Sequence, residues 1–288
     1  MLPIFNGEDT VRRCIDSIKS QTAKNFIVYI SDNCSTDNTF VILNDLTKND
    51  SRFKLIRQQE NLGVSNNFSY LIKLVKTPYV MYIGADDHIN SFFIAEAFKI
   101  ISDDDSVSMV IPNVIYTDSG YSYHGVSDNN LANSPLLRLI NYFSSVTDNG
   151  IFYCLTKTNH LRGIMLELLP KLIPNSGADH FVLASLLIEG KARKTYSVVL
   201  FRSVGKASMT QLNKNSSKKS YLVLLFIQSH CYIKNYIIFL RHYKINLFRY
   251  LIVLLVIIYR HFFKRPIGVL GSIYIKQNLI KLLKLNVK

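Results

Sequence analysis

The chain has 288 residues, of which 48% are hydrophobic, enough to bury one main domain and to carry an extension. Its four cysteines are scattered without a CxxC pair, which argues against a disulfide framework or a cysteine zinc site and fits a reducing cytosol. The net charge of +14 is uneven: residues 1–190 hold 15 Lys/Arg and 20 Asp/Glu, whereas residues 191–288 hold 19 Lys/Arg and no acid. This division predicts a near-neutral body and a basic extension that meets something anionic, either lipid or nucleic acid.

Strand and helix patterns alternate along the first third of the chain, as expected for an α/β layer built from βαβ units. They predict strands over 1–5, 25–31, 53–57 and 79–83, and helices over 9–21, 36–48 and 64–76. Further along we expect strand character over 107–123 and 196–201, and helices over 131–143, 161–169 and 179–188. The N-terminus lacks a basic region followed by an apolar core, so we expect no secretory signal.

Two adjacent carboxylates, Asp86 and Asp87, follow the apolar run that begins at Tyr79. Holding both at the exit of a buried strand is costly, because like charges repel and desolvation penalises each of them. A divalent cation removes this cost, and carboxylate oxygens suit Mg²⁺ or Mn²⁺. The alternative is a turn in which one Asp caps the helix that begins near Ser91. Taken alone, the pair favours this simpler interpretation.

Four polar segments lie at the ends of predicted strands and would meet at one rim of the sheet: Pro3–Glu8, Ser31–Asp37, Asn61–Asn67 and Gly84–Asp87. Each can be explained singly as a turn or a helix cap, but four in this order are hard to dismiss. This ordered set resembles the family 2 glycosyltransferases, the inverting enzymes of the GT-A fold. The resemblance runs from Pro3 to about Arg202, roughly two-thirds of the chain.

The resemblance implies an α/β fold, with a GT-A-type, Rossmann-like mixed sheet flanked by helices and followed by a helical, basic C-terminal extension. It divides the chain into a nucleotide-sugar-binding half over residues 1–112, an acceptor-binding half over 113–205, and a basic amphipathic helical extension over 206–288.

The same resemblance implies how the donor is held. Asp32 would accept a hydrogen bond from the N–H of the nucleotide base, which suits uracil or thymine. Asp87 would ligate a Mn²⁺ or Mg²⁺ ion that bridges the diphosphate, and Asp86 would contact the ribose or the metal. The other donor-binding residues implied by the match are Pro3, Phe5, Asn6, Glu8, Asn61, Gly63, Asn67 and Arg202.

The acceptor half carries Gly177-Ala178-Asp179, which resembles the acidic motif that opens a helix below the donor sugar in this family. Asp179 would take the proton from the acceptor hydroxyl as it attacks the anomeric carbon, and direct displacement would invert the configuration. The alternative is an acid placed at a helix N-terminus because the helix dipole favours it.

Three departures from the family pattern stand out. Phe5 replaces the usual Tyr, so a hydroxyl contact is lost while stacking survives. The His that usually follows the Phe201-Arg202 pair is absent, which weakens the case for a histidine metal ligand there. Only Met1 and Leu2 precede Pro3, where the family has several apolar residues, so we expect the true start to lie upstream or the chain to be truncated.

The basic extension has charge-free stretches over 220–233 and 250–259, which are shorter than the about 20 residues that span a bilayer. Lys234, Arg241, Arg249 and Arg260 fall near one helical face, and 273–285 resembles a last basic amphipathic helix. We expect interfacial helices on an anionic leaflet. The alternative is a helical cap on the catalytic body. We expect no nucleic-acid partner, because no recognition motif is present.

Together these features predict a metal-dependent inverting glycosyltransferase of bacterial surface-polysaccharide synthesis (O-antigen, capsule or exopolysaccharide). It would move a sugar from a nucleoside-diphosphate sugar, with UDP preferred and dTDP or GDP left open, to a hydroxyl of a lipid-linked glycan. It would work in the cytoplasm, on the inner face of the plasma membrane. The alternatives are a catalytically idle GT-A-like module that binds a membrane or partner, and a sugar-phosphate nucleotidyltransferase, whose Gly-rich basic loop is missing from Pro3–Glu8.

Overall fold

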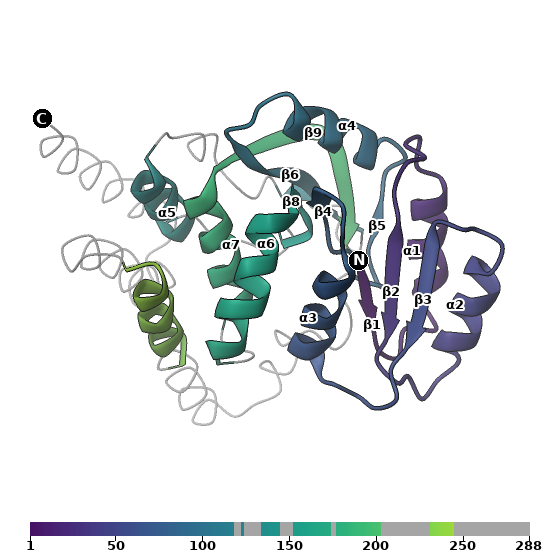
Figure 1. The fold of residues 1–288 in the computed structure, drawn as a ribbon. Helices are drawn as coiled ribbons and strands as arrows, with labels where there is room; N and C mark the ends of the chain where they lie inside the picture. Colours follow the sequence, from purple (N-terminus) through teal and green to yellow (C-terminus); the bar gives the residue numbers. More distant parts are fainter. Residues whose placement is uncertain (118–121, 124–133, 145–151, 174–176, 203–230, 245–288) are drawn as a thin grey trace, which may run out of the picture.

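The computed structural model describes residues 1–117, 122–123, 134–144, 152–173, 177–202 and 231–244 (Figure 1). The charge-free stretch over 250–259, most of the stretch over 220–233 and the helix predicted over 273–285 lie outside this part of the chain. Two sheets, lying side by side, form the centre of the molecule, and helices pack around them.

The first sheet is parallel, and its order is β1 (Leu2–Ile4), β2 (Val28–Asp32), β3 (Phe53–Arg57). Parallel neighbours need a crossover, and the helices α1 (Val11–Lys19) and α2 (Thr39–Thr47) provide it. Helix α1 buries Val11, Cys14, Ile15 and Ile18, the apolar face that the sequence predicts. The register places Ile4 beside Asp32 and Asp32 beside Arg57, so the carboxyl ends of the strands form one rim.

The second sheet is mixed, in the order β4-β8-β6-β9-β5, with β7 paired to β6. Strands β6 and β9 run parallel, and the other pairs in this sheet are antiparallel. The strands are β4 (Tyr79–Val80), β5 (His88–Ile89), β6 (Val107–Tyr116), β7 (Ser122–Tyr123), β8 (Leu155–Lys157) and β9 (Lys191–Arg202).

The remaining helices follow the predicted order. They are α3 (Val64–Leu74), α4 (Phe93–Ser102), α5 (Pro135–Ser144), α6 (Thr158–Gly163) with a π-helical turn η3 (Ile164–Leu168) and a 3-10 turn η4 (Leu169–Lys171), and α7 (Ala178–Glu189). One hydrophobic cluster fills the space between α1, α4 and the two sheets, and a second joins α3, α5, η3 and α7. The two sheets therefore hold the four polar loops, while the second hydrophobic cluster supports the turn that carries Asp179.

The extension contributes one described helix, over residues 231–242. Its inner face is apolar apart from one amide, and the buried residues are Tyr232, Asn235, Tyr236, Phe239 and Leu240. The rings of Tyr232, Tyr236 and Phe239 pack on Phe143 and Phe181, inside the same hydrophobic cluster as α5 and α7. This helix thus covers the body, as in the helical-cap alternative. Within the described residues, no helix is both long and apolar enough to cross a membrane.

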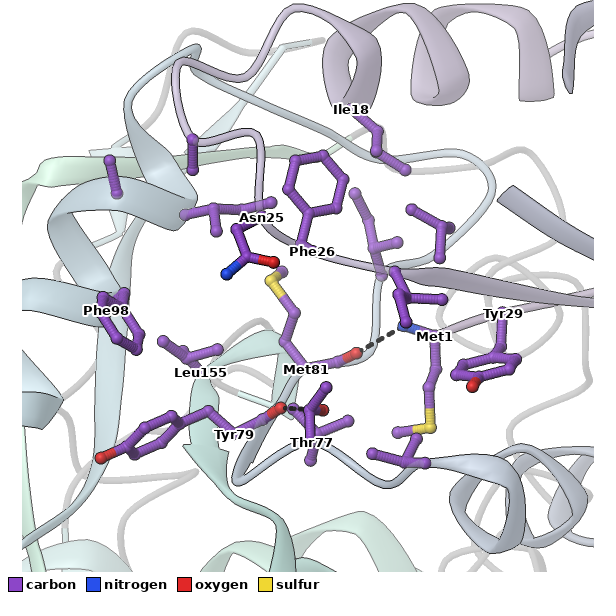
Figure 2. A pocket seen from close by; sticks show the side chains of 18 of the residues that line it. Met1, Ile18, Asn25, Phe26, Tyr29, Thr77, Tyr79, Met81, Phe98 and Leu155 are labelled. Carbon is purple, nitrogen blue, oxygen red and sulfur yellow. Dashed lines mark hydrogen bonds between the residues drawn. The ribbon is translucent and has the colours of Figure 1, made fainter. Parts of the chain in front are cut away.

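A cavity of about 530 Å³ lies where β1 begins, and Figure 2 shows its largely apolar lining. Phe26 and Val28 line it from the side of β2, and Tyr79 and Met81 from the side of β4. The Met1 ammonium donates to the carbonyl of Met81 at 2.7 Å, and the N–H of Ile83 donates to the carbonyl of Met1 at 3.0 Å. These two bonds join the sheets, and the α-amino group of Met1 lies buried at the wall of an apolar cavity.

Candidate active site

Hydrogen bonds join the first polar loop, Pro3–Glu8, to the second, which follows β2. The Asn6 backbone, at φ 52°, donates from its N–H to Ser35 Oγ at 3.0 Å, and the N–H of Thr36 donates back to Asn6 Oδ1 at 2.9 Å. Glu8 Oε2 accepts from both the backbone and the side chain of Asn38, at 2.9 Å each. Asn6 and Glu8 therefore shape the loop. Pro3 is half-buried inside β1, and Phe5 stays 46% exposed, so its ring is available for stacking against a base.

Asp32 ends β2 and is fully buried. Its carboxylate lies 3.6 Å from Arg57 Nε and accepts weakly, at 3.4 Å, from the backbone N–H of Ser35. Arg57 also stacks over the Phe40 ring at 4.8 Å, which orients the guanidinium. Asp32 is thus held as a hydrogen-bond acceptor at the carboxyl end of β2, below the loops. Its predicted contact with a base N–H stays a prediction.

The third loop is tied to the second by an amide pair. Asn33 Nδ2 donates to Asn61 Oδ1 at 2.8 Å, and Asn33 Oδ1 accepts from the N–H of Leu62 at 2.9 Å. Gly63 follows at φ 77°, a conformation that L residues rarely adopt, and α3 begins directly after it. Asn67 is buried and exchanges two hydrogen bonds with Ser31, so in this structure it braces β2 against α3.

The carboxylates of Asp86 and Asp87 converge over Gly84. A methyl group placed on Gly84 would meet Asp86 Oδ1 and Asp87 Oδ2, each at 2.8 Å, so only glycine leaves room for both oxygens. The N–H of Asp87 closes the turn by donating to the carbonyl of Gly84 at 3.1 Å. This loop also touches the first one, because Gly7 would place a Cβ 3.7 Å from that of Ala85.

Arg202, at the end of β9, brings the second half of the fold to these carboxylates. Its Nε lies 3.5 Å from Asp87 Oδ1, and its guanidinium lies over the Tyr153 ring at 5.4 Å. Strand β9 reaches this point because it pairs with β5, which begins directly after Asp87. Burial raises the pKa of Tyr153, and the nearby carboxylate of Asp87 raises it further, so this phenol stays protonated.

A cleft of about 780 Å³ connects these parts. One wall comes from the third loop and α3, the other from η3 and the start of α7, and Tyr153 and Arg202 also line it. Asp179 and His180 face this cleft at the N-terminus of α7. The structure therefore brings together Gly63, Asp179 and Arg202, and through Arg202 it joins them to Asp86 and Asp87.

The donor set at Asp86 and Asp87 fits a divalent cation. Two converging carboxylates are hard oxygen ligands, and Mg²⁺ is usually bound by one or two carboxylates together with substrate phosphates. Among the described residues no group of three His, Cys, Asp or Glu side chains could hold a metal ion without such help. The fit is thus to a cation that arrives with, or is completed by, a diphosphate.

Sequence reasoning missed Asn33 and Tyr153. Asn33 stands inside a recognised motif, and only the register that places it beside Asn61 reveals its bridging amide. Tyr153 lies in a segment without a motif, and only the folded structure places its ring beside Arg202 and in the lining of the cleft. No local pattern could have indicated it.

Known proteins share this chain's sequence pattern and architecture. Residues 1–163 match the sequence model of the family described as "Glycosyl transferase family 2". Glycosyltransferase GlyA of Streptococcus pneumoniae is 31% identical over 101 residues, which cover 35% of this chain and 14% of GlyA. The Escherichia coli protein WfaP, a UDP-Glc:alpha-D-GlcNAc-diphosphoundecaprenol beta-1,3-glucosyltransferase, is 31% identical over 88 residues, 31% of this chain and 34% of that protein. The chain thus spans about a third or less of the length of these curated relatives.

A solved structure resembles the whole described architecture. S. aureus TarS in complex with UDP superposes with a TM-score of 0.65 at 16% identity, over 93% of this chain and 72% of the TarS chain. At this identity the likeness concerns the fold, and it confirms the predicted GT-A class.

Proposed function

The chain belongs to glycosyl transferase family 2, and on that premise we propose that it is an inverting glycosyltransferase that moves a sugar from a nucleoside-diphosphate sugar to a glycan hydroxyl. The observation that carries the proposal is the pair of carboxylates converging over Gly84, next to the cleft that Asp179 faces. A UDP-sugar is the preferred donor, supported by the predicted role of Asp32 and by the UDP bound to the similar TarS structure.

Each residue of the site has a separate role in the proposed reaction. Asp86 and Asp87 would hold Mn²⁺ or Mg²⁺, which supplies charge neutralisation at the diphosphate when bound. Arg202 lies against Asp87 and adds a fixed positive charge to the same end of the cleft. Asp179 takes the proton from the acceptor hydroxyl, so that the oxygen attacks the anomeric carbon from the face opposite the diphosphate. One displacement of this kind inverts the anomeric centre.

No observation supports either alternative function. An idle module would not need two carboxylates packed around a glycine with a third carboxylate facing the adjoining cleft. A nucleotidyltransferase would need a basic glycine-rich loop after β1, and the loop found there is held by Asn6 and Glu8 instead.

Nucleotide binding tests the metal assignment. In Mn²⁺, Asp87→Asn is expected to weaken the binding of UDP and of UDP-sugars by about 100-fold, because one of two cation ligands is lost. In EDTA the variant and the wild-type protein should bind equally weakly. Isothermal titration across UDP-, dTDP- and GDP-sugars measures both conditions. Asp103→Asn, which removes an exposed carboxylate, is the matched control. Equal affinity of Asp87→Asn and wild type in Mn²⁺ would refute the assignment.

We also propose that the acceptor is lipid-linked, in the synthesis of a bacterial surface polysaccharide, and that the protein works in the cytoplasm on the inner face of the plasma membrane. The solvent-facing side of helix 231–242 and its end carry the exposed cations Lys234, Arg241 and Lys244, and residues 191–288 contain no acid to offset them. The name of WfaP also specifies a diphosphoundecaprenol acceptor.

Vesicle flotation tests this surface. We expect the full chain to float with vesicles that contain anionic lipid and to stay behind with neutral ones, because Lys and Arg are attracted to an anionic leaflet by about 1 kcal/mol each. A variant with Lys234, Arg241 and Lys244 all changed to Gln should float less, and 1 M salt should release the wild-type protein. A chain that ignores anionic vesicles at low salt contradicts the proposal.

A further inference from the structure

A buried amide on helix 231–242 hydrogen-bonds to the backbone of Ile173, six residues before Asp179 in the sequence. Asn235 is fully buried, and its Oδ1 accepts from the N–H of Ile173 at 2.6 Å while its Nδ2 donates to the carbonyl of the same residue at 3.0 Å. These two bonds engage the peptide groups on both sides of the Ile173 Cα, so they fix the backbone through this residue, as a neighbouring antiparallel strand would. A buried amide that only filled space would be costly to keep, so the two bonds give Asn235 a specific role.

A ring on the same helix covers the residue where the turn begins. Gly177 has φ 71°, and a Cβ there would lie 2.7 Å from the Tyr232 ring, so both the backbone and the space require glycine. The Tyr232 ring also packs 5.0 Å from that of Phe181 and 6.1 Å from that of His180. Tyr232 therefore presses on the first turn of α7, on either side of Asp179 in the sequence.

The opposite side of this turn is fixed by α5. The Tyr142 hydroxyl, from a fully buried side chain, shares a hydrogen bond of 3.2 Å with Nδ1 of His180. His180 in turn donates from its backbone N–H to Asp179 Oδ1 at 3.1 Å. Asp179 thus lies on a turn held between α5 and helix 231–242.

We propose that helix 231–242 supports the acceptor site, with Asn235 and Tyr232 as positioning residues that hold Asp179 at the cleft. This inference rests on the proposed function, because it takes Asp179 to be the group that accepts the proton. The extension then does two things with two faces of one helix: its cationic face meets an anionic surface, and its buried face orients the base. A helix that only anchored the protein to a membrane would not need the two hydrogen bonds to Ile173.

Kinetics separate positioning from anchoring. Asn235→Ala should lower kcat for sugar transfer by about 10- to 100-fold, because a misplacement of about 1 Å at a catalytic group has effects of this size. The KM for the donor and the affinity for UDP in Mn²⁺ should stay within twofold of wild type. Flotation with anionic vesicles should not change, and the loss should be the same with a lipid-free acceptor glycan in the absence of vesicles.

Leu240→Ala is the matched control for stability. Leu240 is buried on the same helix but away from the Asp179 turn, so its truncation should lower the melting temperature while leaving kcat near wild type. Should Asn235→Ala not fold, Tyr232→Leu tests the same assignment, because it removes the ring that covers Gly177. A wild-type protein that transfers no sugar refutes the proposed function itself. A wild type that transfers sugar, with unchanged kcat in the Asn235 or Tyr232 variant, refutes only the positioning role.

Discussion

Asp179→Asn is expected to lower the rate of sugar transfer by about 10²- to 10⁴-fold, the usual contribution of a general base. The amide has the shape of the carboxylate but does not take a proton at neutral pH. Asp179 faces the cleft at the N-terminus of α7, so the substitution should leave the fold intact. Transfer to an acceptor glycan and binding of UDP in Mn²⁺ are the two measurements, and only the first should change.

The control for this experiment lies on the same helix. Glu189→Gln removes one carboxylate from the exposed C-terminal end of α7 and should leave transfer unchanged. If Asp179→Asn transferred sugar as fast as this control, Asp179 would be no more than an acid favoured by the helix dipole, and another group would have to accept the proton.

The position of the loops proposed to bind the donor could be predicted because their signals are local. Asp32 ends β2 and Asn61 follows β3, and parallel strands bring their carboxyl ends to one rim whatever the details of packing, whereas Asp87 follows β4 of the mixed sheet. The confirmed GT-A fold rests on the same alternation. The strand expected over 79–83 is a limited exception: only Tyr79 and Val80 pair with β8, whereas Met81 and Ile83 hydrogen-bond to Met1.

The half proposed to bind the acceptor is set by contacts between distant segments, which no local pattern records. Strand β9 begins at Lys191, five residues before the predicted start. Charged side chains hide the strand pattern of this first part, and only the pairing of Lys191–Lys194 with β6 reveals it. Asn235 reads as an ordinary polar residue of an apolar helix until Ile173 is found beside it, 62 positions away. The same long-range packing makes helix 231–242 a part of the body, whereas its charge pattern alone favours a membrane surface.

The free energy of unfolding is expected to fall by about 2 kcal/mol between pH 8 and pH 6 because of the Met1 amine alone. Burial lowers the pKa of this amine from 8.0 to about 5 in the folded chain. Between these two pKa values the amine binds a proton in the unfolded state but not in the folded state. Its contribution to the free energy of unfolding is therefore fully present above pH 8 and decreases as the pH falls toward 5. Below pH 5 both states are protonated and the amine has no further effect.

Denaturation of an Nα-acetylated chain isolates this contribution. His88 and His160 also have pKa values lowered by burial, so they destabilise the fold over part of the same range, but they do so equally with and without the acetyl group. The difference between the two proteins at each pH therefore belongs to the amine. The carboxyl groups whose pKa is lowered, such as those of Asp37 and Asp50, act at lower pH. Identical pH profiles for the free and acetylated chains would contradict the burial of this amine.

A strand segment added before Met1 should stabilise the protein more than acetylation does. The cavity of Figure 2 lies between the backbone around Val28 and that around Met81, and the register of β1 with β2 places the added residues between them. A Val/Ile tetrapeptide would replace the amine by a peptide N–H, which bonds Met81 and does not titrate. It would also bury apolar surface worth about 1.5–3 kcal/mol for each side chain that fits. A Gly/Ser tetrapeptide supplies only the N–H, so it should match acetylation. If both tetrapeptides raise the melting temperature equally, side-chain burial in the cavity contributes nothing. If neither does, the space does not accept a strand.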